Sequence, residues 1–158
     1  METRKLQALY GLKYNPFLPN LPKEALYKSK ELDNFCWKIE NLVMDGGFAL
    51  ITGESGLGKS TALRILAEHL RDIPDVSVGV FSRPQSRTND FYRELGGLFD
   101  IDLKTNNRWG GYMALRNKWR SHLEAKLFRP VLLIDEAQEM DADVLSELRL
   151  MTSDDFDT

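Results

Sequence analysis

Gly53-Glu54-Ser55-Gly56-Leu57-Gly58-Lys59-Ser60 is the stretch around which the rest of this chain is organised. A glycine, four free positions and then Gly-Lys-Ser fit the pattern of a loop that cradles phosphates. The glycines let the backbone curl so that successive N–H groups point inward, and a helix beginning at the loop adds its positive end to the same cavity. The stretch therefore predicts a binding site for a polyphosphate.

The residues on either side predict the strand and the helix that such a loop requires. Residues 48–52 form a short apolar run after Gly46-Gly47, which predicts a buried parallel strand. After the loop, apolar residues recur at helical spacing until Pro74 stops the helix; they are Leu63, Leu66, Ala67 and Leu70. This flanking pattern disfavours the alternative of a plain glycine-rich turn with a helix-capping serine.

Within the loop, two side chains have the chemistry to bind a polyphosphate together with Mg²⁺. Lys59 carries a mobile charge for the β and γ phosphates, and the Ser60 hydroxyl is placed to ligate the metal. Thr61 faces elsewhere on the helix and is the weaker candidate. The candidate cofactor-binding residues are Gly53, Glu54, Ser55, Gly56, Leu57, Gly58, Lys59, Ser60 and Thr61.

A second chemical motif follows four aliphatic residues, Val131-Leu132-Leu133-Ile134. Asp135 and Glu136 come directly after them, as is typical of a buried parallel strand whose carboxyl end opens into an active site. Asp135 is the candidate Mg²⁺ ligand beside Ser60, since this ion prefers oxygen ligands. Glu136 is the candidate catalytic residue, with Lys59, because it can orient or deprotonate the attacking water. Alone, such a run is more often a strand followed by a turn, and the complete phosphate loop favours the catalytic interpretation.

Composition bounds the class of protein. The chain has 158 residues, of which 42% are hydrophobic, so it suits one globular domain. A net charge of −3 neither supports nor excludes a nucleic-acid partner. The single cysteine, Cys36, cannot form an internal disulfide and indicates a reducing compartment. No apolar stretch reaches membrane-spanning length, so we expect a cytoplasmic protein with no membrane segment in this chain.

The remaining segments predict an arm followed by alternating helices and strands. Prolines favour turns and extended backbone over residues 1–22, whose aromatic rings either pack on the domain or wall an adenine pocket. Apolar periodicity predicts helices over 30–44, 88–99 and 112–128, a strand over 76–81, a loop over 105–111, and a last helix capped by Asp141. Thr88 and Asn89 are the candidate caps of the second of these helices.

The helix over 112–128 combines an apolar stripe with basic ridges. Leu115, Trp119, Leu123 and Leu127 form the stripe, while Arg116 with Arg120, and Lys118 with His122 and Lys126, form ridges at four-residue spacing. The ridges are either a solvated helix face or a grip for phosphates. Neither His69 nor His122 has a ligand-spaced partner, so neither is assigned a catalytic role.

The two motifs, in this order of elements, resemble those of the AAA+ ATPases of the additional-strand class. Residues 10–17, Tyr-Gly-Leu-Lys-Tyr-Asn-Pro-Phe, look like the opening of the ExeA-like secretion ATPases. Residues 81–85, 90–95 and 108–112 look like relatives carried by transposons as partners of DDE transposases. The resemblance implies an α/β P-loop NTPase fold, a parallel sheet flanked by helices. It also implies an arm over 1–22 and a partial AAA+ domain over 23–158, with Walker A at 53–60 and Walker B at 131–136.

In that family the sheet order is 5-1-4-3-2, so the strand after Walker B lies between the Walker B strand and the phosphate-loop strand. This chain ends at residues 154–158, before that strand, its sensor residue, any arginine finger and the helical lid. We therefore expect a truncated product that contains only the N-terminal part of the domain, because an empty slot leaves two strand edges unpaired. The alternative is that another chain or a rearrangement fills the slot.

The resemblance implies an ATPase that converts ATP to ADP and phosphate. On the first hypothesis it is a transposition helper, which binds double-stranded DNA as an ATP-dependent homo-oligomer and delivers or activates a DDE transposase. A second hypothesis is an ExeA-like assembly ATPase of the general secretion pathway. A third is an inactive nucleotide-binding fragment.

Overall fold

The computed structural model describes residues 2–18, 21–22, 25–81, 84–103 and 111–152. The chain divides into two compact units, Met1–Phe35 and Cys36–Thr158, and each is described by itself. The predicted arm, 1–22, falls within the first unit. Apart from its last residue, the predicted loop over 105–111 lies outside the described residues, as do residues 82–83 and the end of the chain over 154–158.

The first unit begins with a helix, α1 (Glu2–Leu9). The prediction of turns and extended backbone is wrong for these residues, because the first proline is Pro16 and the residues before Gly11 are mostly good helix formers. Gly11 has a φ of 62°, and the N–H of Leu12 donates to the carbonyl of Gln7 at 2.8 Å. A glycine in the left-handed region therefore ends α1, as is common at helix C-termini.

A turn over Pro16 follows α1 within this unit. The Oδ1 of Asn15 accepts a hydrogen bond from the N–H of Phe17 at 3.1 Å, which fixes the turn over this proline. Tyr10 is 69% exposed and Phe17 is 89% exposed. Both rings are exposed within this unit, and the two interpretations of the segment, packing on the domain or walling an adenine pocket, stay predictions.

The second unit contains a two-stranded parallel sheet. β1 (Val76–Phe81) and β2 (Arg129–Ile134) pair over their whole length, from Val76 opposite Arg129 to Phe81 opposite Ile134. Both strands were predicted, although β2 begins two residues before the apolar run. The N–H of Arg129 donates to the carbonyl of Asp75 at 2.7 Å. Since backbone groups alternate sides along a strand, Pro130 faces away from β1, where its missing N–H removes no ladder bond.

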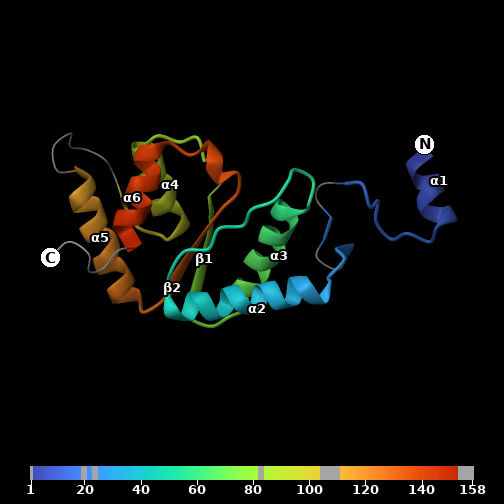
Figure 1. The fold of residues 1–158 in the computed structure, drawn as a ribbon, viewed down its shortest axis with the longest axis horizontal. Helices are drawn as coiled ribbons and strands as arrows, with labels where there is room; N and C mark the ends of the chain where they lie inside the picture. The colour runs from blue at the N-terminus through green and yellow to red at the C-terminus, as the bar shows by residue number, and fades with distance from the viewer. Residues whose placement is uncertain (1, 19–20, 23–24, 82–83, 104–110, 153–158) are drawn as a thin grey trace. The chain divides into compact units, whose positions relative to one another are not determined.

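Helices flank this sheet (Figure 1). They are α2 (Lys30–Asp45), α3 (Lys59–Arg71), α4 (Thr88–Leu98), α5 (Gly111–Lys126) and α6 (Ala142–Thr152). The division between the two units falls within α2. α3 and α4 both pack against β1, and α4 also contacts α6. The predicted α/β class, a parallel sheet flanked by helices, is confirmed, and so are the predicted helices.

The largest core lies between β1 and the helices α4, α5 and α6. Its buried side chains are Phe81, Phe91, Tyr92, Leu95, Phe99, Leu103, Leu115, Trp119, Met140, Val144 and Met151. Aromatic rings hold it together: the ring centroids of Phe81 and Phe91 are 5.6 Å apart, and those of Phe99 and Trp119 are 5.0 Å apart. A separate group on α3 consists of Ile65, Leu66, Ala67 and Leu70.

The predicted apolar stripe of α5 is wrong at Leu127. The helix ends at Lys126, and Leu127 follows it in the left-handed region with a φ of 53° and a side chain that is 85% exposed. Leu115 and Trp119, by contrast, are buried as predicted. The periodic pattern therefore continued for one residue beyond the end of the helix.

Of the two predicted helix caps, the one at α6 is confirmed and the one at α4 is wrong. At α4 the capping residue is Arg87, in extended backbone and without a side-chain bond, so the prediction of Thr88 or Asn89 is wrong. At α6 the Oδ1 of Asp141 accepts a hydrogen bond from the N–H of Asp143 at 3.1 Å. The predicted cap at Asp141 is confirmed.

The predicted strand over 48–52 is wrong, because residues 46–54 have no regular secondary structure. Phe48 is 66% exposed and Leu50 is 82% exposed, so this apolar run is not buried. A strand needs a neighbour that accepts its backbone hydrogen bonds. Among the described residues the only paired strands are β1 and β2.

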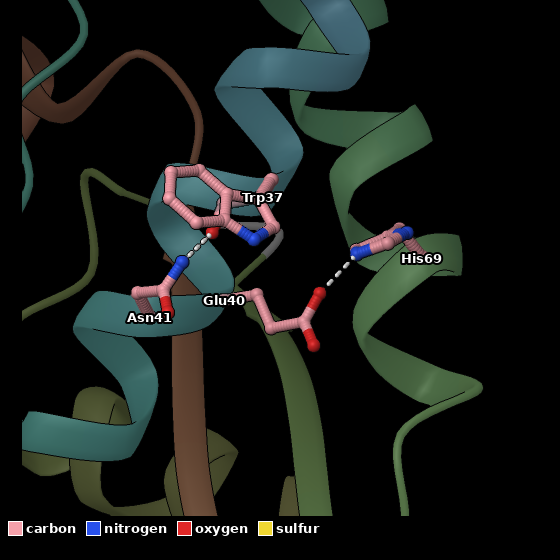
Figure 2. Close-up of polar contacts among 4 residues, drawn as sticks. All are labelled: Trp37, Glu40, Asn41 and His69. Atoms are coloured by element: carbon pink, nitrogen blue, oxygen red, sulfur yellow. Dashed lines mark hydrogen bonds and ion pairs between the residues drawn. The ribbon is translucent and has the colours of Figure 1, made fainter.

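Polar contacts connect α2 to the elements beside it. The Nε2 of His69 on α3 lies 2.8 Å from the Oε2 of Glu40 on α2 (Figure 2). The guanidinium of Arg129, at the start of β2, donates to the carbonyl of Met44 near the end of α2. A cation beside the last carbonyls of a helix also interacts favourably with the helix dipole.

Candidate nucleotide-binding site

The phosphate loop has the backbone that its sequence predicts. Gly53, Gly56 and Gly58 have φ values of 157°, 85° and 84°, a region that side chains with a Cβ rarely adopt. Gly58 is the residue before α3, and its carbonyl accepts the N–H of Ala62 at 2.8 Å to open the helix. The curled glycines thus lead directly into a helix N-terminus, the arrangement that favours an anion.

Lys59 folds back across this loop. Its Nζ donates to the carbonyls of Gly53 at 2.9 Å and of Glu54 at 2.8 Å. The ammonium group therefore spans the mouth of the loop, where its two partners are neutral oxygens that a phosphate can replace. Ser60 and Thr61 lie in the first turn of α3, and both are exposed. These features fit a phosphate group, and the roles of the individual residues stay predictions.

The acid pair occupies a tight turn after β2. The Oδ1 of Asp135 accepts a hydrogen bond from the N–H of Glu136 at 3.0 Å. Glu136 is in the left-handed region, with φ 53° and ψ 42°, and precedes a short 3₁₀ helix, η2 (Ala137–Glu139). Non-glycine residues in this region cost of order 1–3 kcal/mol and are concentrated at functional sites. The side-chain amide of Gln138 donates to the Oε2 of Glu136.

The topology brings the loop and the acid pair to the same end of the sheet. α3 and β1 are both about 20 Å long, from about 1.5 Å per helical residue and 3.3 Å per strand residue. Only residues 72–75 connect α3 to β1, and the helix packs against the strand. Because so short a connection must reverse the direction of the chain, α3 runs antiparallel to β1. The N-terminus of α3 therefore lies at the carboxyl end of β1, and so does Asp135 because β2 is parallel to β1. Both segments lie at the upper end of the sheet in Figure 1.

A groove of about 960 Å³ opens beside Glu136, and its lining contains no residue of the phosphate loop. It runs between α4, the segment after β1, and η2. Its lining residues are Val80, Pro84, Gln85, Ser86, Asp90, Arg93, Glu94, Gly97, Leu98, Glu136 and Glu139. The amide of Gln85 donates to the carboxylate of Glu139 and links the two walls of the groove.

A partly buried polar cluster joins α4, α5 and α6, and sequence reasoning missed it. The hydroxyl of Tyr92 donates to the Oε2 of Glu147 at 2.6 Å, and the Nε of Arg116 lies 3.2 Å from the same oxygen. Burial of Tyr92 raises the pKa of its phenol, and the hydrogen bond to Glu147 raises it further by a smaller amount. The one sequence signal for this position of Arg116 is that it directly follows Leu115, a buried residue of the predicted apolar stripe.

The basic ridges of α5 are used largely within the molecule. Arg116 pairs with Glu147, and the ammonium group of Lys118 donates to the carbonyl of Asp102. The Nε2 of His122 is 2.9 Å from the carbonyl of Phe99. The solvated-face interpretation is therefore wrong for Arg116, which is only 23% exposed.

The fold and the loop together define a P-loop nucleotide-binding domain with helices on a parallel sheet. A model of the AAA domain family matches residues 40–158, and the chain belongs to that family. It is also similar to the general secretion pathway protein A of Aeromonas hydrophila, with 30% identity over 148 residues. That match covers 91% of this chain and 26% of the relative, so the chain spans about a quarter of the relative's length. No solved structure matches the chain. None of the described helices is both long and apolar enough to cross a bilayer.

Proposed function

We propose that this chain binds ATP with Mg²⁺ and hydrolyses it to ADP and phosphate. The observation that carries the proposal is the curled loop at the N-terminus of α3, with Lys59 across its mouth, at the end of the sheet where Asp135 and Glu136 lie. An AAA domain supports the same class of activity.

Each residue of the proposed site has a separate role in binding and hydrolysing a triphosphate. The backbone N–H groups over 53–60 surround the phosphates, and Lys59 exchanges its two carbonyl partners for phosphate oxygens. Ser60 and Asp135 supply oxygen ligands for Mg²⁺, which spreads the negative charge of the phosphates when it is bound. Glu136 orients the attacking water and takes its proton.

We assign the chain to the ExeA-like group and infer a role in a general secretion pathway, where it acts as a homo-oligomer. The similarity to general secretion pathway protein A supports this assignment. The transposition hypothesis, with double-stranded DNA and a DDE transposase as partners, has less support, because Arg116, Lys118 and His122 on the basic helix contact other parts of the chain.

Calorimetry and a phosphate-release assay separate binding from chemistry. We expect Lys59→Ala to weaken ATP binding about 10- to 100-fold, since a hydrogen bond to a charged group contributes about 1.5–3 kcal/mol. Glu136→Gln should leave ATP binding unchanged and lower kcat about 10²- to 10⁴-fold, the range for general acid–base catalysis. Glu139→Gln is the matched control, since it removes a neighbouring carboxylate on the same groove.

Three outcomes would count against this assignment. Unchanged ATP affinity in Lys59→Ala would contradict the proposed phosphate site at this loop. If the wild-type chain binds ATP and does not hydrolyse it, the chain is a nucleotide-binding module and the proposed hydrolysis is excluded. Duplex-DNA binding that requires ATP and weakens steeply with salt would favour the transposition hypothesis over the secretion one.

A further inference from the structure

The side chain of Glu136 has a specific neighbour that the proposed reaction does not use. The amide Nε2 of Gln138 donates to the Oε2 of Glu136, two residues away across the start of η2. Glu136 itself is in the left-handed region, with a φ of 53°. Asp135 holds the backbone N–H of Glu136 in the same turn, at 3.0 Å. One neighbour therefore fixes the backbone of Glu136 and another fixes its carboxylate.

The surroundings explain why such a contact matters. Glu136 is an exposed side chain with several rotatable bonds, so without a partner its carboxylate samples many positions. Asp90, Glu94 and Glu139 line the same groove, and their like charges disfavour a position of Glu136 close to them. Arg93 lines it too, but its guanidinium is paired with Asp90 at 2.7 Å.

A neutral amide is well suited to holding a base. It donates a hydrogen bond that stabilises the charged carboxylate, and it brings no cation to neutralise it. A lysine or arginine at the same place would form an ion pair and suppress proton transfer. Gln138 thus orients Glu136 and leaves its second oxygen available to a water molecule.

We infer that Gln138 is a positioning residue for Glu136, acting on turnover and not on nucleotide affinity. The inference rests on the proposed function, since it needs Glu136 to be the base. Positioning contributes to the rate only after ATP is bound, so loss of the amide changes kcat and leaves KM in place.

The test compares Gln138→Ala and Gln138→Glu with the wild-type chain in steady-state ATP hydrolysis. We expect kcat to fall about 5- to 30-fold in Gln138→Ala, with KM within twofold, because one hydrogen bond to a charged group is lost at an exposed site. Gln138→Glu has nearly the same shape and puts a like charge beside Glu136, so it should lose more. Gln85→Ala is the matched control, because it removes an equivalent amide-to-carboxylate bond on the same groove, to Glu139.

Each outcome has a defined meaning. Lower kcat with unchanged KM in both Gln138 variants, and normal turnover in Gln85→Ala, would support the inference. Turnover of Gln138→Ala within twofold of wild type, or an equal loss in Gln85→Ala, would overturn it. If Glu136→Gln abolishes turnover while Gln138→Ala does not change it, the inference alone fails. A wild-type chain with no turnover overturns the proposed hydrolysis and this inference together. Matching thermal melting curves show whether the near-isosteric Gln138→Glu variant is folded.

Discussion

Residues 131–134 and residues 48–51 are both short apolar runs that lead into a chemically important turn, and they differ in what lies beside them. The first run is part of β2, which pairs with β1 over its full length, and its Leu133 is 8% exposed. The second has no strand neighbour among the described residues, and its Leu50 is 82% exposed. Burial and strand structure therefore follow the available partner and not the composition of the run.

The same difference separates two parts of the second unit. The paired part consists of β1, β2 and the helices α4, α5 and α6, which share one aromatic core. The unpaired part is the segment over 46–54, between α2 and α3. We expect the free energy of unfolding to depend on the first part and to be nearly indifferent to side chains in the second.

The largest expected effect compares a core residue with an exposed one. Phe81 is 2% exposed and packs against Phe91, so Phe81→Ala should lower the free energy of unfolding by about 3–5 kcal/mol. Leu50→Ala should change it by less than about 0.5 kcal/mol, as is usual for exposed sites. Urea unfolding followed by circular dichroism measures both. A cost above about 2 kcal/mol for Leu50→Ala would mean that the segment over 46–54 is buried in solution, and the comparison would fail.

Two adjacent glycines in α4 sharpen the comparison within the paired part. A Cβ on Gly96 would lie 2.4 Å from the carbonyl oxygen of Ile101, whereas a Cβ on Gly97 meets no atom within 4 Å. Gly96→Ala should therefore destabilise the protein by about 1–3 kcal/mol, because backbone must move. Gly97→Ala should stabilise it by about 0.5–1 kcal/mol, because alanine favours the helix. Thermal melting of the two variants checks both signs, and equal shifts would contradict the packing of α4.

Local periodicity was sufficient to predict most of the secondary structure. The helix expected over 30–44 is observed at Lys30–Asp45, and the strand expected over 76–81 is observed without change. These segments carry their signal in their own residues. The absence of a strand over 48–52 could not be predicted from those residues alone, because strand formation depends on hydrogen bonds to another strand.

The candidate site was predictable where a motif fixes the backbone. Three glycines and a lysine identified the loop, whose conformation needs residues without a Cβ. The contact between Gln138 and Glu136 involves a left-handed residue, and a glutamate gives no sequence signal for that conformation. The pair of Arg116 and Glu147 joins two helices that are distant in sequence, so no local pattern indicates it.

The smallest expected effect concerns the helices on either side of the unpaired segment. Glu40 on α2 and His69 on α3 are 2.8 Å apart, and their side chains are 34% and 40% exposed (Figure 2). Pairs this exposed contribute little, so a double-mutant cycle with Glu40→Gln and His69→Gln should give a coupling of about 0.2–0.5 kcal/mol. The part of the coupling that comes from protonated His69 should decrease between about 0.1 M and 1 M NaCl, as the Debye length falls from about 10 Å to 3 Å.

Asn41→Ala is the control for this cycle, since among the described residues the Asn41 amide donates to the carbonyl of Trp37 in its own helix, at 2.7 Å. It should show no coupling to His69→Gln, because additivity holds for residues without a shared partner. A salt-independent coupling above about 1.5 kcal/mol between Glu40 and His69 would indicate a buried contact. The segment over 46–54 would then be enclosed between α2 and α3, and its lack of a strand partner would no longer explain its exposure.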